Sequence, residues 1–273
     1  MSELGKVVGK TFLITGGASG LGAGYVQAFL ENGAKAVAIL DISEEAGKAL
    51  TEKLNNVYPG QVIFWKCDVS SEESLTRVFN EVVNQFTTVD VIINNAGVMN
   101  DSPNMWRKSC DINYQGVVSL TFKGLKHMRK DEGGSGGTII NISSTAALYN
   151  VPYVPTYSGC KAAVLHFSSC IAMDPFHERT GVRILTICVG PTDTPIFSNL
   201  DKLSYDEPCG KEMNQRIDRN ALQKPESAVK GLVEAFKQGV NGSVWLATKN
   251  KPVKDITPVL NEAIDFVKST LEI

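Results

Sequence analysis

The sequence lacks the features of a metalloenzyme or of a nucleotide triphosphatase. It has three histidines, at positions 127, 166 and 177, no HExxH motif, and no CxxC pair among its six cysteines. Because zinc sites are built from such ligand clusters, we expect no metal. The GxxxxGK[ST] pattern of a phosphate-binding P-loop is also absent, which argues against a triphosphate-hydrolysing enzyme.

Charge of one sign and long hydrophobic runs are also lacking. The net charge is −2 and 43% of the residues are apolar, which is ordinary for a globular chain. A nucleic-acid surface needs a basic excess, so no nucleic-acid partner is expected. No apolar run reaches the roughly 18 residues of a membrane span, and MSELGKVVGK at the N-terminus has no signal-peptide core. We therefore expect a cytoplasmic protein without a membrane partner.

Short apolar, β-branched runs alternate with helical patterns along the chain. Most runs are apolar on both faces, as in parallel strands covered by helices above and below. Between them, hydrophobic residues recur at three- and four-residue spacing, with Ser43 and Ser71 as expected helix N-caps. The pattern predicts an α/β fold, a doubly wound (Rossmann) seven-stranded parallel sheet with helices on both faces. The runs lie at 11–15, 36–40, 61–65, 89–93, 138–142, 182–189 and 243–247.

No linker or internal repeat divides this pattern, so we predict a single domain over 1–273. The segment 193–224 interrupts the rhythm between the last two strands, which suits a mobile loop covering a ligand site. The tail, 250–273, carries apolar residues at helical spacing and predicts an amphipathic final helix. That helix could pack on its own subunit or across a subunit interface, and both alternatives stay open.

A glycine-rich turn, TGGASGLG at 15–22, follows the first predicted strand and opens the first predicted helix. Its glycines permit a tight turn and bring backbone N–H groups close to a diphosphate at a helix N-terminus. About 20 residues further on, Asp41 ends the second strand, where a carboxylate can bind an adenosine ribose and repel a 2′-phosphate. These features predict a dinucleotide site that prefers NAD to NADP. The alternative is that Asp41 only caps a turn.

Six motifs in order resemble the short-chain dehydrogenase/reductase family over nearly the whole chain. They are TGGASGLG at 15–22, CDV at 67–69, NNAG at 94–97, DINYQG around Asn113, NISS ending at Ser144, and YSGCK from Tyr157 to Lys161. Ser144 precedes Tyr157 by thirteen residues, the usual spacing in that family. YSGCKAAV together with Asp41 is most similar to insect-type alcohol dehydrogenases, and 15-hydroxyprostaglandin dehydrogenases are similar too.

The resemblance implies the site residues. The implied catalytic residues are Asn113, Ser144, Tyr157 and Lys161, and the implied NAD-binding residues are Gly16, Ser19, Gly20, Leu21, Gly22, Asp41, Asp68, Val69, Asn95, Ala96, Gly97, Tyr157, Lys161, Gly190, Thr192 and Thr194. It also implies that the backbone carbonyl of Asn113 holds a water, and that Thr192 and Thr194 hold the nicotinamide carboxamide. Two positions depart from the pattern. Val154 stands where prostaglandin dehydrogenases carry glutamine, and Val189 replaces a family proline.

The implied reaction is hydride transfer between an alcohol and NAD, with Tyr157 as general base or acid. An ordinary tyrosine has a pKa of about 10. A cation about 5 Å away, at an effective dielectric of about 20, favours the phenolate by about 3 kcal/mol, or roughly 2 pKa units. Lys161 is therefore expected to lower the pKa of Tyr157. Ser144 would hold the substrate oxygen, with Ser143 as the competing serine, and Cys160 is expected in the core.

The expected substrate is a secondary or lipophilic primary alcohol, because the residues expected around it are largely apolar. They are Val151, Tyr153, Val154, Ile196, Phe197 and Leu200. The resemblance also implies a homodimer or homotetramer. Two alternatives remain open at this point: a carbonyl reductase of the same fold, and a non-catalytic dinucleotide-binding or storage protein.

Overall fold

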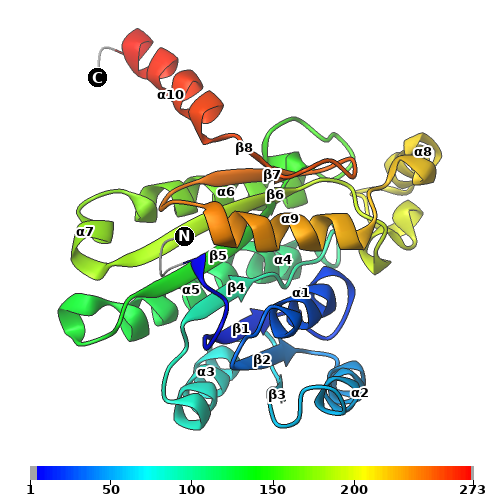
Figure 1. Ribbon diagram of the computed structural model, residues 1–273. Helices are drawn as coiled ribbons and strands as arrows, with labels where there is room; N and C mark the ends of the chain where they lie inside the picture. Colours follow the sequence, from blue (N-terminus) through cyan, green and yellow to red (C-terminus); the bar gives the residue numbers. More distant parts are fainter. Residues whose placement is uncertain (1–4, 272–273) are drawn as a thin grey trace.

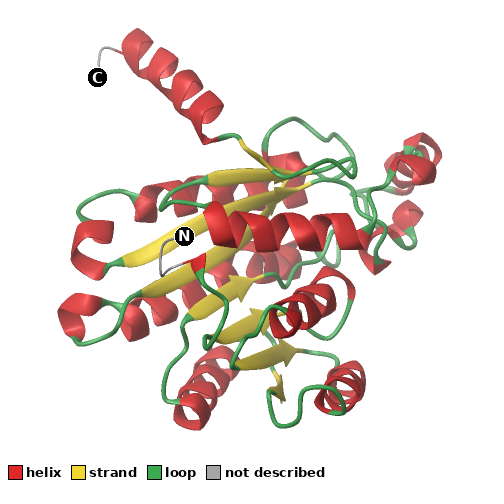
Figure 2. Cartoon of the chain, in the orientation of Figure 1, coloured by secondary structure: helices red, strands yellow, loops and turns green. Residues whose placement is uncertain are grey.

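The computed structural model describes residues 5–271 and contains an eight-stranded sheet with helices on both faces (Figures 1 and 2). The strand order is β3-β2-β1-β4-β5-β6-β7-β8. The strands are β1 (Thr11–Thr15), β2 (Ala36–Asp41), β3 (Val62–Lys66), β4 (Val91–Asn94), β5 (Gly137–Ser144), β6 (Val182–Val189), β7 (Val244–Ala247) and β8 (Lys254–Asp255). Strands β1 to β7 are parallel, which confirms the doubly wound parallel sheet.

The expected count of seven strands is wrong by one edge strand. β8 pairs antiparallel with β7 through only two residues. Both of these residues are charged and exposed. A strand of that length has no apolar alternation, so the sequence pattern carries no signal for it.

The helices form two layers, one on each face of the sheet. Helices α1, α2 and α9 pack on one face, and α3, α5 and α6 pack on the other. The helices are α1 (Gly20–Glu31), α2 (Glu44–Asn55), α3 (Glu72–Phe86), α4 (Trp106–Cys110), α5 (Gly116–Met128), α6 (Pro155–Ala172), α7 (Phe176–Thr180), α8 (Glu207–Arg216), α9 (Pro225–Gln238) and α10 (Thr257–Leu271). Ser43 and Ser71 are the N-cap residues of α2 and α3, and the Ser71 side chain accepts the N–H of Ser74.

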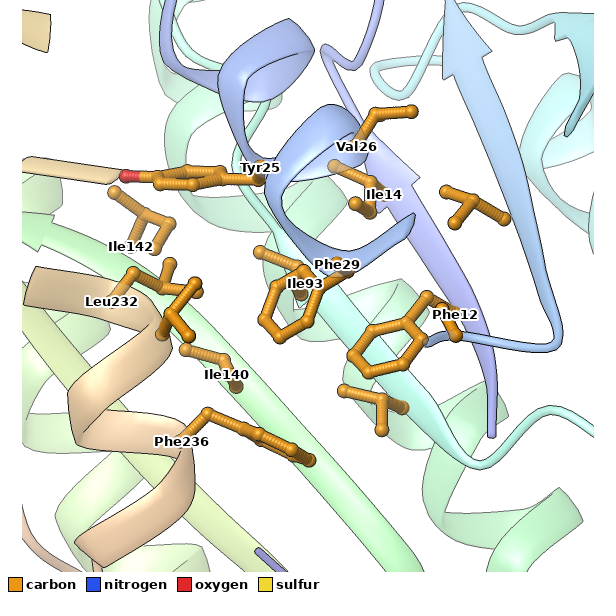
Figure 3. Close-up of a cluster of buried hydrophobic side chains, with 14 of the residues drawn as sticks. Phe12, Ile14, Tyr25, Val26, Phe29, Ile93, Ile140, Ile142, Leu232 and Phe236 are labelled. Atoms are coloured by element: carbon orange, nitrogen blue, oxygen red, sulfur yellow. The ribbon is translucent and has the colours of Figure 1, made fainter. Parts of the chain in front are cut away.

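Three aromatic rings join elements that are distant in the sequence on the first face (Figure 3). Phe12 of β1 stacks on Phe29 of α1 with ring centroids 4.2 Å apart. Phe236 of α9 meets both rings edge-on, at 5.7 and 5.6 Å. Burying large aromatic side chains contributes much of the energy of a core, so this contact fixes α9 beside α1.

The order of the strands reverses between β1 and β4. In such sheets the ligand crevice lies beyond the carboxyl ends of the strands at this point. The glycine-rich turn follows β1, the NNAG turn follows β4 and Ser144 ends β5. All three therefore lie at one edge of the sheet.

The segment 193–224 is more structured than the expected loop. It contains the short 3-10 segments η5 (Pro195–Phe197), η6 (Leu200–Lys202) and η7 (Arg219–Ala221), together with helix α8. Its mobility stays a prediction.

The C-terminal tail forms the expected helix, α10, which extends away from the sheet (Figure 1). None of its residues is buried, and Phe266 is 74% exposed. For α10 a buried face on its own subunit is therefore wrong, although Val253 earlier in the tail packs against the core. Packing across a subunit interface stays a prediction. No helix between residues 5 and 271 has the length and hydropathy needed to cross a membrane.

Candidate active site

A pocket of about 830 Å³ lies at the carboxyl ends of the strands. It is lined by the glycine-rich turn after β1, the ends of β2 and β5, the start of α6 and the segment after β6. Every catalytic and cofactor-binding residue predicted from the sequence lines this pocket, except Asn113. The fold thus brings together residues that are up to 178 positions apart, from Gly16 to Thr194.

The glycine-rich turn is too tight for other side chains. Gly16 and Gly20 have φ values of +62° and +52°, in the left-handed region that glycine adopts readily. A Cβ atom on Gly22 would lie 2.0 Å from the carbonyl oxygen of Gly16. Asn95 also holds this turn, because its Nδ2 donates to the carbonyls of Thr15 (3.0 Å) and Gly16 (3.2 Å).

The N-terminus of α1 faces this pocket without a capping side chain. Its N-cap residue, Ser19, makes no side-chain cap hydrogen bond, and the first turn carries no acidic residue. Backbone N–H groups at such a helix end bind phosphate groups, helped by the helix dipole. The turn therefore fits the diphosphate of a dinucleotide.

Asp41 serves as a turn cap and also lines the pocket. Its Oδ2 accepts the N–H of Ala18 at 3.0 Å, and its Oδ1 accepts the N–H of Ser43 at 2.9 Å. An ionised carboxylate has about four acceptor positions, so two remain for the hydroxyls of a ribose. The two interpretations of Asp41 are therefore compatible.

Asp68 is held by a lysine that the motifs did not reveal. Its Oδ1 accepts the N–H (3.0 Å) and the hydroxyl (2.5 Å) of Ser70, and its Oδ2 accepts from Nζ of Lys108 at 2.9 Å. Lys108 lies 40 positions away on α4. Since it belongs to no motif of the site, only the fold shows this contact.

Tyr157 and Ser144 meet at the junction of β5 and α6. Burial raises the pKa of the Tyr157 phenol above its ordinary value, and a hydrogen bond from the Ser144 side chain acts in the opposite direction. Ser144 ends β5, and its Oγ also accepts the N–H of Ala146 at 3.1 Å. Ser143 lies next to it on a strand whose side chains alternate between faces. Its hydroxyl donates to the carbonyl of Lys161 at 2.8 Å instead.

Lys161 is one turn further along α6 and is buried with only 4% of its surface exposed. Its Nζ donates to the carbonyl of Ile142 at 2.9 Å and lies 5.7 Å from the ring centroid of Tyr157. Burial lowers the pKa of Lys161 to about 8. The expectation that Lys161 lowers the pKa of Tyr157 is therefore wrong for this structure. The sequence argument counted only charge attraction, whereas the loss of water around both groups dominates.

Asn113 lies in a π-helical segment, η2 (Asp111–Gln115), between α4 and α5. Its side chain is fully buried and clamps Val98, with Oδ1 accepting the Val98 N–H at 2.9 Å and Nδ2 donating to the Val98 carbonyl at 2.7 Å. A Cβ atom on Gly97 would lie 3.0 Å from Oδ1 of Asn113 and 3.5 Å from Nζ of Lys161. Asn113 is thus adjacent to Lys161, and the water that its backbone would hold stays a prediction.

A buried glutamine supports the loop after β6. Gln223 is fully buried, and its Nε2 donates to Oγ1 of Thr192 at 2.8 Å and to the carbonyl of Ala247 at 3.0 Å. Its backbone N–H and carbonyl bond Pro191 and Asp193, at 2.9 and 3.0 Å. The sequence analysis missed this residue because no motif surrounds it.

The segment after β6 lines the end of the pocket where the sequence predicted the substrate. Five of the six expected apolar residues line the pocket, whereas Leu200 does not. Leu200 is fully buried and packs with Met99, Val154 and Met213 in a small apolar cluster. The pocket is also lined by residues of this region that were not expected, namely Tyr149, Leu203, Met213, Arg216 and Ile217.

The cysteines lie apart from any metal-binding arrangement. All six are free thiols, and between residues 5 and 271 no three His, Cys, Asp or Glu side chains are grouped as metal ligands. Cys160 is buried, as expected, and burial raises its pKa to about 12. Because the thiolate is the reactive form, such a cysteine is a poor nucleophile.

Two solved structures share the fold. The crystal structure of levodione reductase has a TM-score of 0.75 and 24% identity, over 89% of this chain and 97% of that one. The 3-ketoacyl-(acyl-carrier-protein) reductase from Brucella melitensis, solved in complex with NADH, has a TM-score of 0.74 and 21% identity, over 89% and 98%.

Two curated relatives are similar in sequence. The 15-hydroxyprostaglandin dehydrogenase [NAD(+)] of Mus musculus is 35% identical over 269 residues, covering 94% of this chain and 98% of that protein. Alcohol dehydrogenase 1 of Ceratitis capitata is 30% identical over 257 residues, covering 90% and 96%. The family model described as short chain dehydrogenase matches residues 10–203. With that match added to the glycine-rich turn and the Ser144–Tyr157–Lys161 arrangement, the chain belongs to the short-chain dehydrogenase/reductase family.

Proposed function

We propose that this protein is an NAD-dependent dehydrogenase of secondary or lipophilic primary alcohols. The observation that carries the proposal is the position of Tyr157. Its phenol belongs to a partly buried side chain, interacts with the Ser144 side chain and lies beside Lys161, on the wall of the same pocket that contains the glycine-rich turn. A proton acceptor and a dinucleotide site in one cavity are the two requirements of alcohol oxidation.

NAD fits the other half of the pocket. The uncapped N-terminus of α1 suits a diphosphate, and the acceptor positions left on Asp41 suit the ribose hydroxyls. A 2′-phosphate would be repelled by the Asp41 carboxylate. The mouse relative is described as NAD(+)-dependent and the Brucella reductase was solved with NADH, which supports NAD. Bound here, NAD supplies the acceptor for the hydride.

Ser144 and Tyr157 would position the alcohol and accept its hydroxyl proton. The Ser144 hydroxyl donates a hydrogen bond to the substrate oxygen and holds it against Tyr157, whose phenolate oxygen takes the hydroxyl proton. The phenol takes this proton only after losing its own. Burial raises the pKa of Tyr157 above its ordinary value and lowers the pKa of Lys161 to about 8. In the reverse direction the same phenol returns the proton, so a carbonyl reductase uses the same residues.

The substrate end favours a hydrophobic alcohol. Val151, Val154, Ile196 and Phe197 line it, and apolar walls with a few polar groups are typical of such ligand sites. Val154 replaces the glutamine of prostaglandin dehydrogenases. We therefore propose lipophilic alcohols as the substrate class and do not extend the proposal to prostaglandins.

The test is NADH formation by purified protein with hydroxy acids, terpenoid alcohols, steroids and short alkanols. Tyr157→Phe should abolish the reaction and keep NADH binding, measured by fluorescence titration, because only the hydroxyl is removed. Ser144→Ala should lose activity by orders of magnitude with near-normal NADH binding. Normal NADH production by Tyr157→Phe would show that the base lies elsewhere and would overturn the proposal.

A further inference from the structure

The helix that carries Tyr157 begins without a local cap. In α6 the N-cap position is occupied by Val154, which makes no side-chain cap hydrogen bond, and Pro155 follows at the first helical position. The N–H groups of the next two residues, Thr156 and Tyr157, have no partner within the helix. Buried N–H groups need an acceptor, so it has to come from elsewhere in the chain.

Asp101 provides this acceptor from the loop after β4. Its Oδ2 accepts the N–H of Thr156 at 2.5 Å, and its Oδ1 accepts the N–H of Tyr157 at 3.0 Å. Asp101 is 2% exposed. A side-chain oxygen that accepts these two N–H groups does the work of an N-cap, and its negative charge is favourable at the positive end of the helix dipole. One residue thus fixes the backbone of the proposed base.

The same residue also contacts the segment that covers the substrate end. The backbone N–H of Asp101 donates to the carbonyl of Leu203 at 2.6 Å. Close by, the Ser204 hydroxyl donates to the carbonyl of Tyr153, just before α6, at 2.7 Å. Asp101 therefore lies where the loop after β4, the start of α6 and the covering segment meet.

The loop that carries Asp101 is itself held in place. Asn113 clamps Val98, three residues earlier, through two hydrogen bonds. The Ser109 hydroxyl donates to the carbonyl of Asn100 at 2.6 Å. Asn113 and Ser109 are both buried. The loop that carries Asp101 is therefore held in a fixed position relative to Tyr157.

We propose that Asp101 is a positioning residue that sets the orientation of Tyr157 for proton transfer. The inference rests on the proposed function, because it concerns the same base. Without the carboxylate, the first turn of α6 loses two hydrogen bonds and the phenol moves relative to Ser144 and Lys161. A displacement of about 1 Å in a catalytic group can cost on the order of 100-fold in rate. Asp101 does not line the pocket, and the glycine-rich turn and Asp41 that would hold the diphosphate and ribose are separate from its hydrogen bonds, so NADH binding should be largely preserved.

The experiment compares Asp101→Ala and Asp101→Asn with a matched control, Asp90→Ala. Asp90 also accepts a backbone N–H through its carboxylate, from Thr11 at 2.7 Å, but it precedes β4 at the edge of the sheet away from the pocket. Each protein is measured for kcat and KM with the best alcohol and for NADH affinity. Thermal unfolding and amide hydrogen exchange of peptides containing Thr156 and Tyr157 are measured on the same samples.

We expect Asp101→Ala to lower kcat on the order of 100-fold, with NADH affinity within about twofold of the unmutated protein. Its Thr156 and Tyr157 amides should exchange faster. Asp101→Asn keeps one acceptor oxygen and should recover part of kcat. Loss of one capping group should lower Tm by roughly 2–4 °C. Asp90→Ala should lower Tm similarly and leave kcat unchanged, which separates positioning from general destabilisation.

Three results would overturn the inference. They are unchanged kcat in Asp101→Ala, an equal loss of kcat in Asp90→Ala, or unchanged exchange of the Tyr157 amide in Asp101→Ala. If the unmutated protein oxidises no alcohol, the proposed function fails instead. The exchange data still decide in that case whether Asp101 holds Tyr157, because they need no turnover.

Discussion

The two halves of the pocket are built differently. The cofactor half consists of the ends of β1, β2 and β4 and a glycine turn in which backbone meets backbone, as at Gly22. The substrate half is covered by short helical segments that rest on the small apolar cluster of Met99, Val154, Leu200 and Met213. At the glycine turn backbone packs against backbone, whereas the covering segment is held by the small apolar cluster and by the Asp101–Leu203 and Ser204–Tyr153 hydrogen bonds.

This difference separates two tasks. A half built from close backbone contacts suits a cofactor that is held in one place, and a half built from side chains on a connecting segment can differ with the substrate. Tyr157 lies on the boundary, in the partly buried layer around the small cluster. Substitutions in the first half should therefore affect cofactor binding, and substitutions in the second should affect substrate use.

The largest effect is expected from Gly22→Ala. The new Cβ would lie 2.0 Å from the Gly16 carbonyl, and neither backbone segment can give way. NADH binding, measured by fluorescence titration, should be lost, and Tm should fall. The matched control is Gly159→Ala in α6, where a Cβ meets nothing within 4 Å. It should gain about 1 kcal/mol of helix stability. Retained NADH binding in Gly22→Ala would show that the turn can deform.

The pH dependence of alcohol oxidation tests Tyr157 and Lys161, which lie between the two halves of the pocket. We expect alcohol oxidation to require the Tyr157 phenolate, so the rate should rise about tenfold per pH unit below the pKa of Tyr157, which burial raises above its ordinary value of about 10. Burial lowers the pKa of Lys161 to about 8, so its charge should be lost before the phenol ionises, and the midpoint in Lys161→Ala should stay close to that of the unmutated protein. A midpoint well below 10 that moves upward in Lys161→Ala would show that Lys161 lowers the pKa of Tyr157 after all.

The cofactor preference tests the outer end of the cofactor half. We expect at least about tenfold preference for NAD over NADP, and Asp41→Ala should shrink it because the repulsion of a 2′-phosphate disappears. The variant also loses two backbone hydrogen bonds, so its Tm should be measured alongside kcat/KM for both cofactors. Equal turnover of both cofactors by the unmutated protein would remove Asp41 from this role.

The smallest effect is expected in the substrate half. Leu200→Ala leaves a cavity in the small cluster and weakens the attachment of the covering segment. The KM for the alcohol should rise by roughly three- to tenfold, a change of about 1 kcal/mol, while the affinity for NADH stays unchanged. An equal loss of NADH affinity would mean that the two halves are coupled, contrary to the comparison.

The residues that we propose for the chemistry could be found from the sequence to a large extent. The strands were visible because both of their faces are apolar, and the resemblance supplied Ser144, Tyr157 and Lys161 at the spacing that the structure brings into one pocket. The missed residues have a common reason. Asp101, Lys108 and Gln223 act on partners 24 to 56 positions away, and none belongs to a periodic pattern. Their contacts exist only once the sheet is formed.

The sequence by itself determined the order of strands and helices, the glycine turn and the choice of a dinucleotide site, because these depend on local backbone preference and on hydrophobic period. Only the tertiary structure decided the direction in which the pKa values of Tyr157 and Lys161 shift, because burial opposes the effect expected from charge alone. The tertiary structure also decided that Leu200 is buried behind the pocket wall while the apolar residues of α10 remain exposed. Leu200 and the apolar residues of α10 look alike in the sequence, because whether an apolar side chain is buried depends on which other elements pack against it.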